Sequence, residues 1–246
     1  MKPIIKYRGG KSKEIQHFLP HIPEYAGRYI EPFFGGGSLF FYLEPERGII
    51  NDINTKLIQF YLGVRDDYPH LHDELARLEE IYNRNRKRFE KRKAAAPDKR
   101  VLDENEELYY RLRDMYNGLT RPDYSEAALY YYINKTAYSG MIRFNRNGEY
   151  NVPYGRYKNF NTAIITEAHS DLLQRTEIMN QDYREIFNQA QPDDFMFLDP
   201  PYDCIFSDYG NEEYREGFNE ASHRALAEDI RNRFHSEAKH ILVANY

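Results

Sequence analysis

The sequence predicts an α/β fold in which a Rossmann-like sheet is interrupted by a mainly helical insertion. Short apolar segments alternate with helical ones in the first quarter of the chain, as they do in a βαβ unit. Strand patterns nearly vanish from about residue 66 to residue 161 and then resume. We therefore expect one sheet-containing domain from residues 1–64 and 162–246, with an inserted domain from residues 65–161 between the two parts.

The first quarter contains three expected helices and two expected strands. Ser12 is a candidate N-cap for the first helix, and Pro20 is expected to stop it. The glycines at 35–37 separate the first strand from the second helix. In chain order, the expected elements are a helix at 12–19, a strand at 28–31, a helix at 38–43, a strand at 48–51 and a helix at 54–62.

Charged helices dominate the insertion, and strands return after it. Helices are expected at 71–93, 107–119 and 126–136, and strands at 177–180, 195–198 and 240–244. Asn147 and Gly148 predict a tight hairpin turn between Arg143 and Tyr154. The sequence stops at Tyr246 directly after an apolar strand, so we expect the C-terminal strands of the sheet to be missing from it.

Composition excludes a membrane protein and a disulfide-stabilised one. No apolar run approaches the roughly 20 residues of a membrane span, so no membrane partner is expected. The opening MKPIIKYRGGK has no secretory apolar core, which favours a cytoplasmic protein. Cys204 is the single cysteine and has no partner for an internal disulfide.

The net charge of −5 argues against a polyanionic partner, but the charge is unevenly distributed. Nine Lys and Arg residues fall within residues 83–100, against Glu90 and Asp98. This stretch suits a phosphate backbone and equally suits a solvated helix face. The 23 tyrosines suit base stacking, although core and ordinary surface positions explain most of them.

A glycine-rich turn, EPFFGGGS at 31–38, lies between the first strand and the second helix. Glycines there let a ligand approach the backbone, which makes Glu31, Phe33, Gly35 and Gly37 candidate cofactor contacts. The turn departs from GxGxxG, and the chain lacks GxxxxGK[ST], which disfavours dinucleotides and ATP. A tight turn without a ligand is the alternative.

Asp52 ends the second strand, where an acidic residue can accept hydrogen bonds from ribose hydroxyls. The alternative is that Asp52 caps a helix that begins at Ile53.

The segment FLDPPYD at 197–203 carries the strongest signal for chemistry. These residue types suit a reaction at the exocyclic amine of adenine. That amine is a poor nucleophile, so a catalyst must accept hydrogen bonds from its N–H groups. Asp199 and the carbonyl of Pro200 can do so, because consecutive prolines hold that carbonyl rigidly. Tyr202 can stack on a base extruded from a duplex. A strand that ends in a proline-rich turn is the alternative.

These motifs, in this order, resemble the D12 class of DNA adenine-N6 methyltransferases with α-type motif order. The resemblance rests on KYRGGK at 6–11, EPFFGGGS, Asp52, NVPYGRYK at 151–158 and DPPY at 199–202. It implies a Rossmann-like methyltransferase sheet with an inserted target-recognition domain. It also implies methyl transfer from S-adenosylmethionine to a flipped adenine in double-stranded DNA, with S-adenosylhomocysteine as product. Such an enzyme acts in a prokaryotic cytoplasm or a phage-infected cell, in a restriction–modification, phage or housekeeping setting.

The resemblance also implies cofactor contacts. Tyr7 and Lys11 match the cofactor-binding residues of the first motif, and Asp52 matches the ribose-binding acid. Asp182 and Tyr183 match the acid and aromatic on the adenine side of the cofactor. Asp199 is implied to face both the cofactor and the substrate.

The family's DNA-reading hairpin resembles residues 138–157. Tyr138 is implied to wedge into the base stack, and Arg143 to bind guanine O6 and N7. Pro153 is expected to touch a base methyl group, and Asn145 and Arg156 are further candidate DNA contacts. Ser139 stands where relatives that recognise GATC have Asn, so that specificity does not transfer directly.

Other chemistries have weaker support in the sequence. His17 and His21 have helical spacing, but Pro20 interrupts that helix and no third ligand is evident, so no metal is expected. Cys204 follows the DPPY motif, yet methyl transfer to an amine needs no thiolate. An RNA adenine methyltransferase, a cytosine-N4 enzyme and a non-catalytic DNA-binding relative remain as alternatives; Asp199 disfavours the cytosine enzymes, which resemble SPPY.

Overall fold

The computed structural model describes residues 1–7, 9–11, 14–201, 218–234 and 241–243. In this part of the chain, five parallel strands form one sheet in the order β3-β2-β1-β4-β5. The strands are β1 (Tyr29–Glu31), β2 (Gly48–Asn51), β3 (Thr176–Met179), β4 (Phe195–Leu198) and β5 (Ile241–Val243). The chain passes from β1 to β2 and β3 on one side and then returns to place β4 on the other. The strand order therefore reverses between β1 and β4, where open α/β sheets bind ligands.

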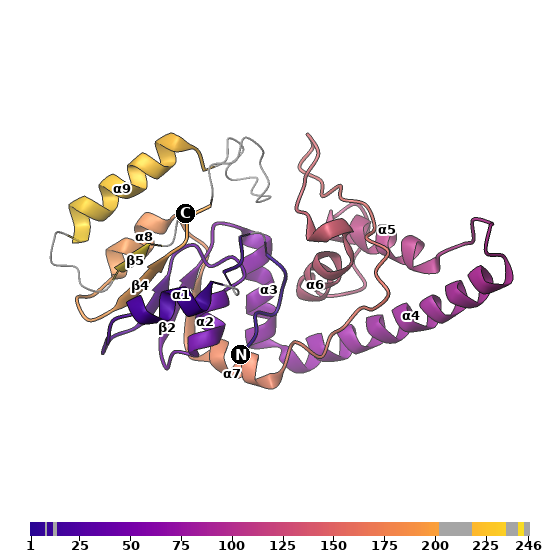
Figure 1. Cartoon of the computed structure of the whole chain (residues 1–246), viewed down its shortest axis with the longest axis horizontal. Coiled ribbons are helices and arrows are strands. Elements are labelled where there is room, and N and C mark those ends of the chain that lie inside the picture. Colours follow the sequence, from indigo (N-terminus) through magenta and orange to yellow (C-terminus); the bar gives the residue numbers. More distant parts are fainter. Residues whose placement is uncertain (8, 12–13, 202–217, 235–240, 244–246) are drawn as a thin grey trace.

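Neighbouring residues of each central strand face opposite layers. Ile30, Met196 and Leu198 pack in one apolar cluster with α8 (Tyr183–Gln189) and α9 (Glu220–Phe234). On the other face, Tyr29 and its neighbours Phe195 and Phe197 join a larger core that includes residues of α1 (Ile15–Phe18), α2 (Ser38–Leu43), α3 (Thr55–Asp66) and α7 (Glu167–Gln174). The sheet is thus covered by helices on both faces (Figure 1).

The helices between α3 and α7 form the insertion. They are α4 (Tyr68–Ala95), α5 (Glu104–Tyr116) and α6 (Glu126–Thr136), followed by the 3₁₀ turn η2 (Tyr138–Gly140). α4 runs outward from the sheet, and α5 and α6 lie alongside α4 (Figure 1). The buried side chains of α4, including Leu71, Leu75, Leu78 and Tyr82, recur at spacings of three and four residues, which places them on one face of the helix. The fold class predicted from the sequence is confirmed.

The insertion and the sheet share one apolar core. Tyr82 and Tyr132 of the insertion belong to the same buried cluster as Tyr29 and Phe197 of the sheet. The predicted domain boundary at residue 64 falls inside α3, which packs against both α6 and α7. Many of the tyrosines whose abundance suggested base stacking are therefore core residues with buried rings.

Several predicted elements need correction. The helix expected at 12–19 begins at Ile15, and Pro20 lies within the 3₁₀ turn η1 (Leu19–His21) rather than ending a helix. A proline is tolerated there because the first residues of a helical turn need no N–H donor. Ser12 lies outside the described residues. Two insertion helices also differ: α4 extends beyond both expected ends, and α5 begins and ends earlier than expected.

Three helices had no counterpart in the prediction: α7, α8 and α9. α7 and α8 are short, and each has a polar N-terminal signal that defines its start. Thr166 and His169 form a reciprocal capping box before α7, and Asp182 caps α8. Short amphipathic helices beside strands carry weak periodicity, so the caps were the better signal.

The basic stretch at 83–100 forms the outer half of α4 and the loop after it. Arg86 pairs with Glu90 at 2.8 Å, and Arg92 pairs with Glu104 of α5 at 3.2 Å. Lys87 lies on the exposed side of α4, opposite the buried stripe. This arrangement favours the solvated helix face over a phosphate-binding strip.

Two further findings concern the described residues alone. None of the described helices combines the length and the apolar character that a bilayer crossing requires. In the same part of the chain, no group of three or more His, Cys, Asp or Glu side chains is arranged to hold a metal ion.

Candidate active site

A cavity of about 810 Å³, including space open to solvent, lies at the carboxyl ends of β1, β2 and β4. This is the edge of the sheet at which the strand order reverses. Most of the predicted cofactor and catalytic residues line it, namely Tyr7, Lys11, Glu31, Phe33, Gly35, Gly37, Asp52, Tyr183, Asp199 and Pro200. Tyr202 lies outside the described residues.

The glycine-rich turn forms one wall of the cavity. Gly35 and Gly37 have positive φ values of 48° and 61°, which glycine adopts without steric cost. A Cβ atom on Gly35 would lie 2.9 Å from the ring of Tyr7, and one on Gly37 would lie 2.3 Å from the ring of Phe34. Aromatic rings pack directly against the backbone of the turn, so these positions have no room for a side chain. Tyr7 reaches it from the N-terminal segment.

Asp52 ties the glycine-rich turn to the start of α3. One of its carboxylate oxygens accepts a hydrogen bond from the Gly35 amide at 2.8 Å, and the other accepts one from the Asn54 amide at 2.9 Å. The N-cap of α3 is Asn54, so the alternative in which Asp52 caps a helix from Ile53 is wrong. The Asp52 carboxylate also lines the cavity.

Asp199 follows β4 and faces the cavity with Lys11. The Lys11 ammonium lies 3.6 Å from Asp199 Oδ1, and the Lys11 side chain is only 3% exposed. Burial raises the pKa of Asp199 to about 7, and Lys11 limits that rise. Pro200 and Pro201 come next and also line the cavity. Asp199 and Pro200 thus line the same cavity as the glycine-rich turn.

The cavity carries an excess of carboxyl groups. Glu31 ends β1 and accepts a hydrogen bond from the Tyr29 hydroxyl at 2.7 Å. Burial raises the pKa of Glu31 well above its ordinary value, and the charges of Asp199 and Asp52 add to the effect. Glu31, Asp52 and Asp199 face one lysine, Lys11, among the described lining residues. Such a cavity favours a ligand that carries positive charge.

Aromatic rings also line the cavity. The rings of Phe33 and Tyr183 lie 5.3 Å apart, and Phe218 meets Phe33 edge to face at 5.8 Å. The Tyr183 hydroxyl donates to Asp229 of α9 at 2.8 Å, and Arg184 donates to the same carboxylate oxygen at 2.8 Å. Phe218 and Asp229 were not predicted, because they follow the DPPY motif at a distance and have no local signature.

Asn51 is another residue that the prediction missed. Its amide nitrogen donates to the carbonyls of Pro32 at 2.9 Å and Gln181 at 3.0 Å, and its oxygen accepts from the Gln181 amide at 2.9 Å. These bonds join the end of β2 to the segments that follow β1 and β3. A polar residue at the end of a buried strand, next to Asp52, was the available signal. Asp182 itself caps α8 and is not among the residues that line the cavity.

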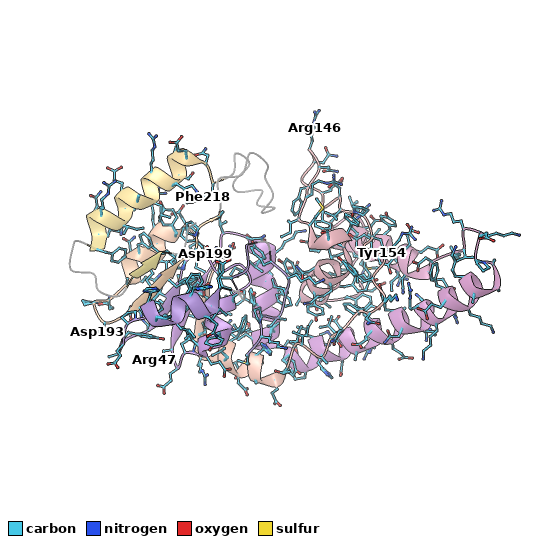
Figure 2. The ribbon with its side chains drawn as sticks, in the orientation of Figure 1. Arg47, Arg146, Tyr154, Asp193, Asp199 and Phe218 are labelled. Atoms are coloured by element: carbon cyan, nitrogen blue, oxygen red, sulfur yellow. The ribbon has the colours of Figure 1, made fainter. Side chains whose placement is uncertain are left out.

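The predicted hairpin is present beyond η2. Backbone bridges pair Ala137 with Tyr154 and Phe144 with Tyr150, and Gly148 in the turn has a φ of 80°. Figure 2 shows Arg146 at the outer end of this hairpin, with Asp199 and Phe218 in the sheet-containing part of the molecule. The Asn147–Gly148 signal therefore located the turn correctly.

The candidate DNA contacts differ in how firmly the protein holds them. The Tyr138 side chain is 56% exposed, and its amide donates to the Pro153 carbonyl at 2.9 Å. Arg143 donates through Nε to the Asn151 side chain at 2.8 Å and through Nη2 to the Asn151 carbonyl at 3.2 Å. Tyr138 therefore lies at the base of the hairpin with an exposed side chain, and Arg143 lies on the hairpin itself.

Two other candidates have partners within the protein. Asn145 accepts hydrogen bonds from the amides of Asn147 and Glu149, so its side chain shapes the turn. Arg156 pairs with Glu106 of α5 at 2.6 Å. Both therefore brace the hairpin, and a role in DNA contact stays a prediction for each.

Comparison with known proteins agrees with this geometry. The family model for D12 class N6 adenine-specific DNA methyltransferases matches residues 7–245. The chain is 35% identical to the Type II methyltransferase M.CviBI of Paramecium bursaria Chlorella virus NC1A, over 85% of this chain and 72% of the relative. It is 32% identical to M.MjaIII of Methanocaldococcus jannaschii, over 100% of this chain and 85% of the relative.

A DNA adenine methylase of Vibrio cholerae is 27% identical over 100% of this chain and 81% of its own length. The family match covers both the sheet and the insertion, and its extent agrees with the motif order read from the sequence. The chain therefore belongs to the D12 class of N6 adenine-specific DNA methyltransferases.

Proposed function

We propose that this chain methylates adenine N6 at a specific sequence in double-stranded DNA, using S-adenosylmethionine bound in the cavity at the ends of β1, β2 and β4. The observation that carries the proposal is the position of Asp199. Its carboxyl lies in the same cavity as the glycine-rich turn and Asp52, so cofactor and substrate would meet at one point. This activity requires the compartment that holds DNA, the cytoplasm of a prokaryote or infected cell.

The lining residues fit the cofactor. S-adenosylmethionine, when bound, supplies an electrophilic methyl group on a positively charged sulfur. The Asp52 and Asp199 carboxyls can provide the opposite charge, and the Asp52 carboxylate, which lines the cavity, suits ribose hydroxyls. Phe33 and Tyr183 offer apolar faces to the adenine ring of the cofactor. Asp182, at the start of α8, is the candidate acceptor for the amine of that ring.

Asp199 and Pro200 would act on the target base. Asp199 accepts one N–H of the adenine amine, and the Pro200 carbonyl accepts the other. These two acceptors favour the form in which the nitrogen lone pair is available, and their fixed positions avoid reorganisation during the reaction. The raised pKa makes the ionised Asp199 a stronger hydrogen-bond acceptor than an exposed aspartate. Tyr202, which follows in the sequence, is proposed to stack on the extruded base.

The hairpin would read the DNA. Tyr138 has the exposure that a wedging ring needs, and its backbone is held by Pro153. The contacts of Arg143 with Asn151 fix the direction of the guanidinium, which leaves donors for guanine. Pro153 is exposed beside them and can contact a base methyl group. Residues 65–161 are accordingly proposed as the target-recognition part of the enzyme.

The test is to express the chain in a host without adenine methylation and to map modified bases by sequencing genomic DNA. The expected result is N6-methyladenine at one short sequence motif. An Asp199→Ala variant expressed to the same level serves as the control and should give no signal. Absence of N6-methyladenine with the wild type, or an unchanged map with the variant, would overturn the proposal.

A further inference from the structure

Asn134 of α6 binds both backbone groups of one residue in the N-terminal segment. Its side-chain oxygen accepts a hydrogen bond from the Lys6 amide at 3.1 Å, and its nitrogen donates to the Lys6 carbonyl at 2.7 Å. The Asn134 side chain is 9% exposed, so these bonds are largely shielded from water. Asn134 therefore ties α6 to residues that are distant in sequence.

The N-terminal segment leads from this contact directly to the cavity. Tyr7, the next residue, packs against Gly35 and Gly36 of the glycine-rich turn. Lys11 then lies beside Asp199. A displacement of Lys6 would move the ring of Tyr7, because only one peptide bond separates the two residues.

The same contact lies close to the hairpin. α6 ends at Thr136, and Tyr138 follows directly in η2. A Cβ atom on Gly140 would lie 3.8 Å from the Lys6 side chain, and the Lys6 ammonium lies 4.8 Å from the ring of Tyr157. Lys6 is therefore held between Asn134 and both ends of the segment proposed to read DNA.

A second bond on the same helix reinforces the connection. The Lys135 ammonium donates to the Ile4 carbonyl at 2.7 Å, and the Ile4 and Ile5 side chains are buried in the shared core. The N-terminal segment thus has a fixed register on α6, and the pair of bonds from Asn134 holds the backbone of Lys6, the residue that precedes Tyr7.

We propose that Asn134 is a positioning residue that couples DNA binding at the hairpin to cofactor binding at Tyr7 and Lys11. The inference rests on the proposed function, because it takes the cavity as the cofactor site and the hairpin as the DNA site. DNA that orders η2 and α6 fixes Lys6, and through Lys6 it fixes the wall of the cofactor cavity. By reciprocity, the cofactor strengthens DNA binding by the same factor.

The chain offers a matched control in Asn117 at the end of α5. Asn117 binds the Tyr150 backbone in the same way, accepting from its amide at 2.8 Å and donating to its carbonyl at 3.0 Å. Truncation of Asn117 removes an equivalent pair of bonds from the hairpin and leaves the N-terminal segment untouched. The Asn117 variant therefore distinguishes an effect of losing hairpin order from an effect of losing the coupling between the two sites.

The experiment titrates S-adenosylhomocysteine by calorimetry into the full chain alone and into the chain saturated with a duplex that carries the mapped site. The ratio of the two dissociation constants is the coupling factor. We expect a factor on the order of tenfold for the wild type, with tighter binding in the presence of DNA. Asn134→Ala should reduce the factor to about one, whereas Asn117→Ala should weaken DNA binding and keep the factor.

Two results would overturn the inference while leaving the proposed function intact: a wild-type factor of about one with both ligands bound, or an unchanged factor in Asn134→Ala. Failure of the wild type to bind either ligand would instead reject the proposed function, and the inference with it. If Asn134→Ala lacks a cooperative thermal transition, Asn134→Asp takes its place. Asp keeps the acceptor for the Lys6 amide and loses the donor, so an undiminished factor in that variant also overturns the inference.

Discussion

The ammonium of Lys11 lies 3.6 Å from a carboxylate oxygen of Asp199, although the two residues are far apart in the sequence. Burial disfavours the ionised form of Asp199, while Lys11 favours it. The balance leaves the pKa of this carboxyl at about 7, close to the pH at which the enzyme would work. The position of Lys11 therefore sets how much of Asp199 is ionised.

The first prediction concerns pH. Protonated Asp199 presents a donor where the adenine amine needs an acceptor, so kcat/KM for S-adenosylmethionine should fall as the pH drops through about 7. Lys11→Met removes the charge that lowers the pKa of Asp199 and should move the midpoint to higher pH. Rate profiles of the two proteins check this, and coincident midpoints would contradict the assigned role of Lys11.

Asp199→Ala should reduce kcat by at least about 100-fold, because one fixed acceptor for the adenine amine is lost. The residues proposed to read DNA lie on the separate hairpin, so the affinity for a duplex that carries the site should change little. Single-turnover methylation and fluorescence anisotropy measure the two quantities. Near-normal methylation by Asp199→Ala would exclude this residue from catalysis.

Gly35→Ala should impair cofactor binding. The change forces a side chain into a positive φ of 48° and places Cβ 2.9 Å from the Tyr7 ring, so the ring must move. We expect the KM for S-adenosylmethionine to rise by about tenfold. Gly118→Ala is the control, because Gly118 has a φ of 70° and nothing within 4 Å of the added Cβ.

Gly118→Ala should therefore lose about 1–2 kcal/mol of stability from backbone strain and keep the wild-type KM. Thermal melts and initial rates of both variants make the comparison. Equal KM values in the two proteins would show that Tyr7 does not shape the cofactor site.

Arg143→Ala should relax the recognition sequence at one base pair, since a bidentate arginine–guanine contact contributes about 1–3 kcal/mol of discrimination. Arg146→Ala, at the outer end of the hairpin, is the comparison (Figure 2). It is expected to weaken DNA binding evenly across sequences. Modified-base sequencing with each variant reads out the result, and a methylation motif that survives Arg143→Ala unchanged would rule out guanine reading by this residue.

Asp229→Ala should weaken cofactor binding although Asp229 is outside the cavity. The Tyr183 hydroxyl would lose its acceptor, and the ring beside Phe33 would lose its fixed position. We expect about fivefold weaker binding of S-adenosylhomocysteine, which corresponds to about 1 kcal/mol for one hydrogen bond. Asp229→Asn keeps an acceptor and should retain most of the affinity; equal losses in both variants would point to the charge on Arg184 instead.

The parallel strands were predictable because buried strands leave short apolar runs that end at polar residues. β2 and β4 matched the expected ranges, and Asp52 and Asp199 followed them as predicted. Helices with weak periodicity were not predictable in the same way. α8 is short and depends on its packing with α9, which the local pattern does not reveal; the Asp182 cap was its local signal.

The sequence by itself determined the family, the α/β class and the identity of the polar residues at the strand ends, because these are local patterns that the chain carries in order. Only the tertiary structure decided which distant groups meet: Lys11 with Asp199, Asn134 with Lys6, and Asp229 with Tyr183. The physical reason is that such pairs depend on sheet order and helix packing. Those follow from the burial of one continuous core, which no short stretch of sequence specifies.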